Sequence, residues 1–269
     1  MVASRQFSIG ENTPRLDGCR ALVTGAGGGI GSACAYRLAA GGASVALVDM
    51  RGGAAEAVAS KIREDGGNAI GFEGDVGSQP SMQTVADEAA KALDGLDTIV
   101  PCAAISVPSA TTALSLEIWD TLIRVNLTGV FLTIKSALPH LLAAGGGCIV
   151  TIGSMGSLVA AGESCAYDAS KGGVLQFTRA IAVEYAAEGI RANCVCPGRV
   201  PTGLGVNSHQ LTSLSSVQPK DSASRRAYIP MSRSGDPDEI AAVVAFMCSD
   251  GASYMTGAAI PVDGGYSAV

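Results

Sequence analysis

Aromatic residues, histidine and net positive charge are all scarce in this chain of 269 residues. Aromatic side chains make up 4% of the sequence, which leaves few surfaces on which the bases of single-stranded nucleic acid could stack. The formal net charge of -6 repels phosphate backbones and anionic lipid, and no basic run offsets it. We therefore expect no nucleic-acid partner and no membrane partner.

Metal ligands of the histidine type are also few, since His140 and His209 lie far apart in the sequence. A histidine-based metal site is thus not expected, and we predict no bound metal. The eight cysteines lie mostly inside apolar runs, and the spacing of Cys194 and Cys196 differs from a CxxC redox or zinc pair. We expect reduced, buried thiols in a cytoplasmic protein.

Targeting segments are not apparent in the sequence pattern. Residues 1–17 are polar and mixed, without the basic-then-apolar order of a secretory signal. No apolar stretch reaches membrane-spanning length without glycine or charge. We interpret residues 1–17 as an N-terminal extension and residues 18–269 as a single domain.

Short apolar runs alternate with alanine-rich stretches through this domain. The predicted strands are 20–24, 44–49, 69–73, 98–100, 147–152, 191–196 and 259–262. The predicted helices run from a glycine cluster to about residue 40, and over 54–64, 81–93, 116–143, 166–188 and 238–248. Nearly unbroken apolar strands that alternate with helices indicate an α/β fold. We expect a doubly wound parallel sheet of about seven strands, flanked by helices on both faces.

Residues 203–230 break this alternation, being rich in serine, glutamine, asparagine and charge without a clear period. A long irregular stretch inside a compact domain is usually a functional lid or a disordered excursion. We favour the first alternative and interpret residues 203–230 as a lid that covers a substrate site.

The glycine-rich turn Thr24-Gly-Ala-Gly-Gly-Gly-Ile-Gly31 directly follows the first predicted strand and opens a helix. Glycines let the backbone approach a pyrophosphate, and the helix N-terminus offers free N–H groups and positive potential. The turn therefore predicts a Rossmann-type dinucleotide site, although glycine clusters also form plain turns. Its candidate cofactor-binding residues are Gly25, Gly29, Ile30 and Gly31.

Asp49 ends the second predicted strand, eighteen residues after Gly31, where an acidic residue would hydrogen-bond the adenosine ribose. A 2′-phosphate at ~4 Å from this carboxylate would cost about 4 kcal/mol at an effective dielectric constant near 20, which favours NAD over NADP. Arg51 argues against this choice of NAD, since its guanidinium could swing toward the 2′-phosphate of NADP. Asp49 is otherwise an ordinary turn residue at a strand end.

Two neighbouring positions complete the adenosine side of this expected site. Met50 adjoins Asp49, and Asp75-Val76 follows the third predicted strand, where Asp75 could hydrogen-bond the adenine amino group. A simple turn aspartate explains Asp75 nearly as well.

Tyr167 and Lys171, in Tyr-Asp-Ala-Ser-Lys, lie four residues apart on one face of a predicted helix. A free tyrosine has a pKa of about 10 and is a poor base at neutral pH. A nearby lysine ammonium favours the tyrosinate and lowers that pKa, and an oxidised nicotinamide adds a second positive charge. Such a tyrosine can take a proton from an alcohol or return one to a ketone, although the spacing alone also occurs in surface pairs.

In combination, these motifs resemble the short-chain dehydrogenase/reductase family over almost the full chain. Ser154, thirteen residues before Tyr167 at the end of a predicted strand, resembles the family's catalytic serine, which holds the substrate oxygen. Asn126, in Val-Asn-Leu-Thr-Gly, resembles the asparagine that anchors a proton-relay water; its other reading is a polar residue that bends a helix. The resemblance thus implies Tyr167, Lys171, Ser154 and Asn126 as the catalytic set, with Tyr167 and Lys171 also touching the cofactor.

The segment 197–202 resembles the family's stretch after its sixth strand, and 256–265 its C-terminal strand and turn. The resemblance places Pro197, Gly198, Val200 and Thr202 at the cofactor. The Val200 backbone and the Thr202 hydroxyl would there orient the nicotinamide carboxamide.

One motif departs from the family, whose members usually carry Asn-Asn-Ala-Gly after the fourth strand. Here the stretch is Pro101-Cys-Ala-Ala104, in which Pro101 has no N–H to donate and Cys102 is a weak hydrogen-bonding group. The departure affects the strand geometry and the adenosine side of the site, where Cys102 and Ala103 are expected, but it removes no catalytic group.

The resemblance implies an enzyme that transfers a hydride between NAD(H) and a secondary alcohol or ketone, with Tyr167 as the general acid and base. The alternatives are an NADP-dependent reductase of the same fold and a non-catalytic cofactor-sensing protein. The substrate is expected to be a small molecule, neutral or mostly apolar. The resemblance also implies a homo-oligomer, most often a tetramer in this family. Its subunits could pack through the apolar C-terminal segment 258–269.

Overall fold

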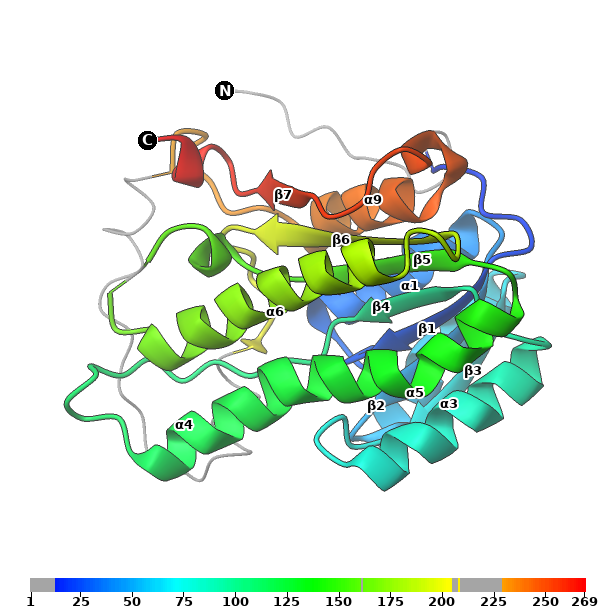
Figure 1. The fold of residues 1–269 in the computed structure, drawn as a ribbon, viewed down its shortest axis with the longest axis horizontal. Helices are drawn as coiled ribbons and strands as arrows, with labels where there is room; N and C mark the ends of the chain where they lie inside the picture. Colours follow the sequence, from blue (N-terminus) through cyan, green and yellow to red (C-terminus); the bar gives the residue numbers. More distant parts are fainter. Residues whose placement is uncertain (1–12, 161, 205–207, 209–228) are drawn as a thin grey trace.

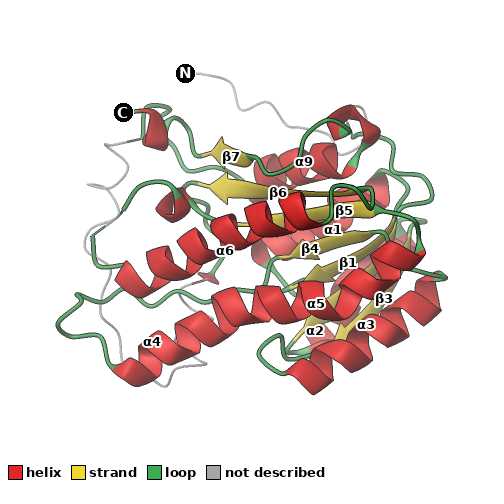
Figure 2. Cartoon of the chain, in the orientation of Figure 1, coloured by secondary structure: helices red, strands yellow, loops and turns green. Residues whose placement is uncertain are grey.

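The computed structural model describes residues 13–160, 162–204, 208 and 229–269. These residues contain a seven-stranded sheet in the order β3-β2-β1-β4-β5-β6-β7, in which every pair of neighbours is parallel (Figures 1 and 2). The strands are β1 Arg20–Thr24, β2 Ser44–Asp49, β3 Asn68–Glu73, β4 Thr98–Pro101, β5 Gly147–Ile152, β6 Ile190–Pro197 and β7 Ala259–Val262. The predicted doubly wound sheet is confirmed, with strand ends shifted by one residue at β3, β4 and β6.

Helices cover both faces of the sheet, which explains why its strands are apolar on both sides (Figure 1). On one face lie α1 Gly29–Ala40, α2 Gly52–Glu64 and α9 Pro237–Cys248, which share one apolar core with the sheet. On the other lie α3 Gln79–Leu93, α5 Gly129–Ala143 and α6 Cys165–Glu184, which share a second core with it.

The helix predicted over residues 116–143 consists of three pieces. Helix α4 Leu116–Ile123 leads into a π-helical segment, η1 Arg124–Thr128, and then into α5. The whole stretch is long and apolar enough to cross a membrane, but 61% of its most apolar part is buried inside the protein, as in a core helix. Single π-helical turns inside α-helices are frequent at functional sites, and this one contains Asn126.

Helix α6 ends at Glu184, four residues before the predicted end at Glu188. The chain turns there because Gly189 adopts a left-handed conformation, with φ of +77°, and the Ile190 N–H donates to the Tyr185 carbonyl. The alanine-rich sequence 182–188 favours a helix locally, but the turn into β6 decides its end.

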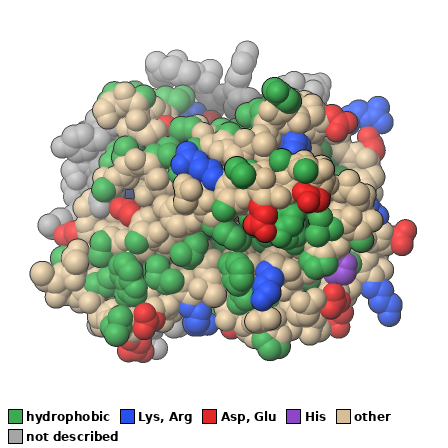
Figure 3. Space-filling model, viewed as in Figure 1, with side chains coloured by type: hydrophobic (Ala, Val, Ile, Leu, Met, Phe, Trp, Pro, Cys, Tyr) green, Lys and Arg blue, Asp and Glu red, His purple; other side chains and the backbone are tan. Residues whose placement is uncertain are grey.

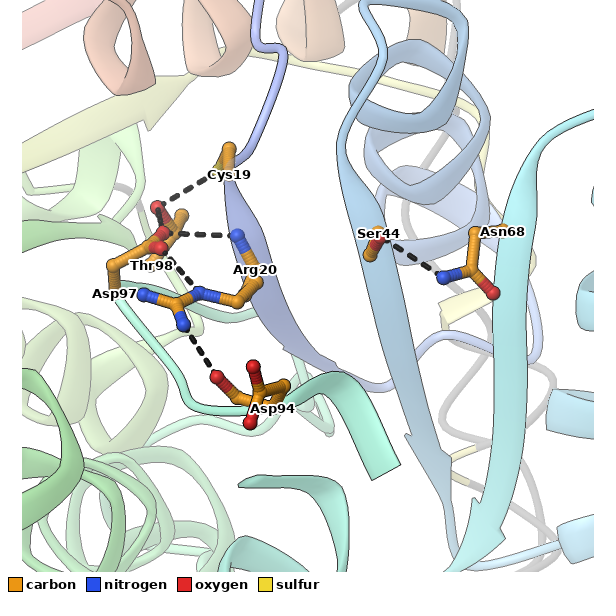
Figure 4. Close-up of polar contacts among 7 residues, drawn as sticks. All are labelled: Cys19, Arg20, Ser44, Asn68, Asp94, Asp97 and Thr98. Carbon is orange, nitrogen blue, oxygen red and sulfur yellow. Dashed lines mark hydrogen bonds and ion pairs between the residues drawn. The ribbon is translucent and has the colours of Figure 1, made fainter. Parts of the chain in front are cut away.

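Polar contacts hold the amino ends of neighbouring strands together (Figure 4). Arg20 at the start of β1 donates from its backbone N–H and its Nε to the two carboxylate oxygens of Asp97, at 2.9 and 3.0 Å. The Asn68 amide at the start of β3 donates to the Ser44 hydroxyl of β2 at 3.0 Å. These side chains occupy the amino edge of the sheet, so the opposite, carboxyl edge is where a ligand site can form.

The predicted extension and the predicted lid lie largely outside the described residues. Of the extension, residues 13–17 are described, and they pack on the end of α1: Leu16 is buried and its N–H donates to the Gly41 carbonyl at 2.7 Å. Of residues 203–230, only 203, 204, 208, 229 and 230 are described. The Ser208 hydroxyl accepts the Ser106 N–H at 2.8 Å, which joins this segment to the loop after β4.

Candidate active site

The glycine-rich turn forms the tight connection from β1 to α1 that its sequence predicts. Gly31 is required by contact, because a Cβ there would lie 2.1 Å from the Gly25 carbonyl oxygen. Gly29 is required by conformation, with φ of +57°. Gly28 precedes α1 without any side-chain cap, and a Cβ built on it meets nothing within 4 Å. The first turn of α1 therefore presents backbone N–H groups to open space, as anion-binding helix ends do.

A cavity of about 270 Å³ opens at the carboxyl ends of β1 and β4, where the strand order reverses. Ligands of doubly wound sheets bind at this switch point. The structure brings most of the predicted site residues together in its wall: Gly25, Gly29, Ile30, Gly31, Asp49, Met50, Val76, Cys102, Ala103, Ser154, Tyr167, Lys171, Pro197, Gly198, Val200 and Thr202. Asp75 and Asn126 are not in the cavity wall.

The Asp49 carboxylate is held by backbone groups on both of its oxygens. One oxygen accepts the Gly27 N–H at 3.0 Å and the other accepts the Arg51 N–H at 3.0 Å. The Arg51 guanidinium lies 3.6 Å from the second oxygen and is mostly exposed. Asp49 is thus fixed beside the glycine turn. Arg51, which could bind the 2′-phosphate of NADP, lines the same cavity.

Asp75 occupies the turn after β3, next to the cavity wall formed by Gly74 and Val76. One of its carboxylate oxygens accepts the Gly77 N–H at 2.8 Å, and the other lies 3.8 Å from the Arg124 guanidinium. These contacts are those of a turn aspartate, so the proposed contact with adenine stays a prediction.

The departure from the family motif has a visible consequence in the sheet. The Cys102 N–H donates to the Thr24 carbonyl on β1 at 3.2 Å, and because N–H directions alternate along a strand, the Pro101 nitrogen faces β5. Proline cannot donate there, and the pairing of β4 with β5 stops at Ile99–Ile149. β4 still pairs with β1 through Pro101, which faces Thr24.

Ser154, Tyr167 and Lys171 converge at the carboxyl end of β5. Ser154 follows β5, and its hydroxyl accepts the Gly156 N–H at 3.0 Å while its own N–H donates to the Ser157 hydroxyl at 3.1 Å. The Ser157 hydroxyl in turn donates to the Lys171 carbonyl at 2.7 Å. This chain of bonds ties the serine to α6, the helix that carries Tyr167 and Lys171.

The two ionisable groups of this site both have shifted pKa values. Desolvation raises the pKa of Tyr167 to about 12, against a hydrogen bond to Ser154 that lowers it, while Asp168 raises it further. Burial lowers the pKa of Lys171 to about 8, opposed by the nearby thiols of Cys194, Cys102 and Cys196. Perturbed pKa values of this kind are characteristic of functional sites.

The direction for Tyr167 differs from the sequence-based expectation that a lysine lowers its pKa. The Lys171 Nζ donates to the Ile152 carbonyl at 2.8 Å and lies 5.8 Å from the centre of the tyrosine ring. Burial of the phenol is the largest cause of the shift, and the hydrogen bond to Ser154 opposes it. The Tyr167 phenol is therefore protonated at neutral pH.

Asn126 is fully buried and connects three segments. Its side-chain oxygen accepts the Ile105 N–H at 2.8 Å, and its amide donates to the Ile105 carbonyl at 2.9 Å and to the Ser170 hydroxyl at 3.2 Å. Both amide protons are thus used within the protein. The structure supports the helix-bending role, and the role as an anchor of a relay water stays a prediction.

Several cavity residues have no signal in the sequence that would single them out. Apart from Arg51, they are small or apolar residues that contribute backbone or wall: Gly28, Val48, Gly74, Ala104, Ile105, Val125, Ile152, Gly153 and Leu204. Of these residues, only Gly28 could have been predicted, because it belongs to the glycine-rich turn and directly precedes α1. Within the described part of the chain, no cluster of three or more His, Cys, Asp or Glu side chains is arranged to hold a metal.

The comparisons with known proteins agree with this geometry. The family model described as enoyl-(acyl carrier protein) reductase matches residues 25–267. The chain is 38% identical to D-threitol dehydrogenase of Mycolicibacterium smegmatis over 267 residues, which cover 99% of both chains. The chain belongs to the short-chain dehydrogenase/reductase family.

Two further members show the same relationship in sequence and in structure. Cis-4-hydroxycyclohexanecarboxylate dehydrogenase of Sinomonas cyclohexanicum is 40% identical over 250 residues, 93% of this chain and 96% of that one. A crystal structure described as an NAD(P)-dependent gluconate 5-dehydrogenase from Beutenbergia cavernae, with bound NADP, superimposes with a TM-score of 0.86. It is 34% identical and covers 95% of this chain and 99% of its own. This short-chain dehydrogenase/reductase is an NAD(P)-dependent oxidoreductase acting on CH–OH groups.

Proposed function

We propose that this short-chain dehydrogenase/reductase interconverts a neutral secondary alcohol and its ketone, with NAD rather than NADP as its cofactor. The observation that carries the proposal is the convergence of Ser154, Tyr167 and Lys171 on a cavity that also contains the glycine turn and Asp49. Packing alone does not explain Lys171, which is 2% exposed and carries an ionisable group into the protein interior.

Residues of the cavity wall suit the separate parts of a dinucleotide. The uncapped first turn of α1 and the open position at Gly28 suit a pyrophosphate, and Asp49 stands at the end of β2 where a ribose would lie. Pro197, Gly198, Val200 and Thr202 line the same cavity as Tyr167. The nicotinamide ring, when bound, accepts or donates the hydride.

The protein's own groups handle the proton and the substrate oxygen. The Ser154 hydroxyl accepts the Gly156 N–H and lies close enough to the Tyr167 phenol to lower its pKa, so we expect one substrate oxygen to contact both hydroxyls. The Tyr167 phenol, protonated at neutral pH, donates to a ketone oxygen; in the alcohol direction it takes the proton back. The Lys171 ammonium supplies positive charge behind the phenol and is oriented by the Ile152 carbonyl.

The choice of NAD rests on the Asp49 carboxylate. Two backbone N–H groups fix it beside the turn, where the 2′-phosphate of NADP would meet negative charge. Arg51 lines the same cavity and could offset that repulsion, so an NADP-dependent enzyme is the second candidate.

A neutral substrate is favoured by the charges in the wall. Ile105, Val125 and Leu204 contribute apolar surface, whereas Arg199 lines a separate cavity of about 110 Å³ next to Asp263. Of the described arginines, only Arg51 lines the main cavity, at its Asp49 side, so no guanidinium there is placed to clamp a substrate carboxylate.

The test is the absorbance of reduced nicotinamide with a panel of neutral alcohols, ketones and hydroxy acids, each with NAD(H) and NADP(H). We expect turnover of neutral secondary alcohols, faster with NAD. The Tyr167→Phe variant should lower kcat by about 10²- to 10⁴-fold while its dissociation constant for NADH stays unchanged. Binding of NADH without turnover of any substrate would instead support a cofactor-sensing protein, and equal activity of Tyr167→Phe would refute the assigned role.

We also propose that the enzyme is a homo-oligomer, most simply a tetramer. Figure 3 shows hydrophobic side chains on the face formed by α4, α5 and α6, where Leu116, Phe131, Leu142 and Val183 are exposed. β7, within the apolar C-terminal segment, is an edge strand of the sheet. Light scattering after size exclusion should give a multiple of the chain mass, and a Val183→Lys variant should give a smaller one. A monomer at micromolar concentration would contradict the proposal.

A cytoplasmic location is proposed on the state of the thiols. All eight cysteines are free in the structure, as expected in a reducing compartment. Fractionation of cells that express the tagged chain checks this.

A further inference from the structure

Ser154 lies beyond the paired part of its own strand. The register of β5 with β4 ends at Ile149, and its register with β6 ends at Ile152. One more backbone bond follows, from the Gly153 N–H to the Val195 carbonyl at 2.8 Å. The sheet therefore does not fix the position of the Ser154 hydroxyl, and the turn that follows β5 has to do so.

This turn is the short helical segment η2, Met155–Ser157, and its last residue fixes it to α6. The Ser157 hydroxyl accepts the Ser154 N–H at 3.1 Å and donates to the Lys171 carbonyl at 2.7 Å. A hydroxyl can do both at once, because it has one proton and two lone pairs. Ser157 is thus a direct link between the backbone of Ser154 and the helix that carries Tyr167.

Lys171 holds the chain on both sides of Ser154. Its Nζ donates to the carbonyl of Ile152, two residues before the serine, and its own carbonyl accepts from Ser157, three residues after it. Tyr167 lies one helical turn before Lys171 on α6. The same turn of α6 therefore sets the positions of both the phenol and the serine hydroxyl.

The middle of the turn also lies against α6. A Cβ at Gly156 would collide with a carboxylate oxygen of Asp168, whose other oxygen accepts the Ser164 hydroxyl at 2.7 Å. The Gly156 N–H donates to the Ser154 hydroxyl at 3.0 Å. The turn thus has no room to move closer to α6 at this point, and a shift of Gly156 would move the donor that orients Ser154.

We propose that Ser157 is a positioning residue for the reaction, which holds the Ser154 hydroxyl where one substrate oxygen contacts both Ser154 and the Tyr167 phenol. Ser154 and Tyr167 line the cofactor cavity and Ser157 does not, so Ser157 acts through Ser154 and not on the substrate. A displacement of ~1 Å at a reacting group can cost about 10²-fold in rate. The inference rests on the proposed function of Ser154 and Tyr167.

The experiment measures kcat, KM and the dissociation constant for the reduced cofactor in Ser157→Ala and Ser157→Thr. It uses the alcohol or ketone that the panel shows to be turned over fastest, with whichever nicotinamide cofactor serves it. In Ser157→Ala, kcat should fall about 10- to 100-fold while the cofactor dissociation constant stays unchanged. Ser157→Thr keeps the hydroxyl and should recover most of kcat.

The matched control is Ser249→Ala. The Ser249 hydroxyl also donates to a backbone carbonyl, that of Phe246 at 2.8 Å, but it lies after α9 and outside the cavity wall. Its loss should leave kcat unchanged.

A second comparison separates positioning of Ser154 from a general structural role. In a Ser154→Ala background, Ser157→Ala should not lower kcat further, because the hydroxyl that Ser157 positions is already absent. Gly156→Ala, which keeps the Ser157 hydroxyl but places a methyl group against Asp168, should lower kcat in the wild type and not in the Ser154→Ala background.

Two outcomes overturn the inference while Ser154→Ala itself is impaired: full kcat in Ser157→Ala, or an equal loss from Ser157→Ala in both backgrounds. The second would show that Ser157 supports the fold of α6 and not the serine. Full kcat in Ser154→Ala would instead refute the proposed role of Ser154, and the positioning role would fall with it.

Discussion

Replacing Lys171 by methionine should change how stability depends on pH, because the lysine is buried at a cost. Its pKa falls from 10.5 to about 8, mainly through burial. One pKa unit corresponds to about 1.4 kcal/mol, so the ammonium form is disfavoured in the folded state by roughly 3 kcal/mol. The penalty applies in full below the folded pKa, where Lys171 is charged in both states.

The sign follows from the protons bound in each state. Between about pH 8 and 10.5, the unfolded chain holds the lysine proton and the folded protein does not, so the free energy of unfolding rises with pH. A methionine at this position removes that slope. It also leaves the Ile152 carbonyl without its 2.8 Å donor, which costs about 1–3 kcal/mol at every pH.

The assay is urea denaturation of both proteins from pH 7 to pH 10, and the quantity is the difference between their free energies of unfolding. Relative to Lys171→Met, the wild type should gain roughly 2–3 kcal/mol over this range, because all other titrating groups are common to both proteins. Lys135→Met, at an exposed position on α5, is the matched control and should show no comparable slope. A difference that stays constant from pH 7 to pH 10 would refute the assigned burial cost.

Three further substitutions test other parts of the structure. Asp49→Asn removes a charge but keeps an acceptor for the Gly27 N–H, so kcat/KM with NADP should rise about 10- to 100-fold relative to NAD; an unchanged ratio would show that Asp49 does not meet the ribose. Asp238→Ala leaves the guanidinium of Arg37, whose side chain is 5% exposed, without its carboxylate, which should cost about 3 kcal/mol in urea denaturation; the double variant with Arg37→Met should recover part of this loss. Asn126→Ala leaves two backbone groups of the loop after β4 without partners and should lower the free energy of unfolding by ~2–4 kcal/mol, measured in the same way; a smaller loss would mean that water replaces the amide.

Much of the candidate site could be predicted because its signals are local. The glycine turn must follow a strand and open a helix, and Tyr167 and Lys171 share a face because they are four residues apart. Prediction was less successful where distant contacts decide. Pro101 ends the pairing of β4 with β5, and the π-helical turn at Asn126 interrupts a segment that reads as one continuous helix.

The ionisation of the site was the least accessible from sequence. Spacing places an ammonium near a phenol and suggests a lowered pKa, but the Lys171 Nζ bonds to the Ile152 carbonyl and desolvation raises the pKa of Tyr167 to about 12. The same holds for the Arg37–Asp238 ion pair, whose partners are far apart in the chain.

From its sequence alone, this protein is determined as a doubly wound α/β enzyme with a dinucleotide turn and a tyrosine–lysine pair, because strand periodicity, glycine requirements and helical spacing act within a few residues. Only the tertiary structure decided which side chains meet at the carboxyl edge of the sheet and how deeply each is buried. Burial and hydrogen bonding set their pKa values, and both depend on neighbours that the chain brings together from distant positions.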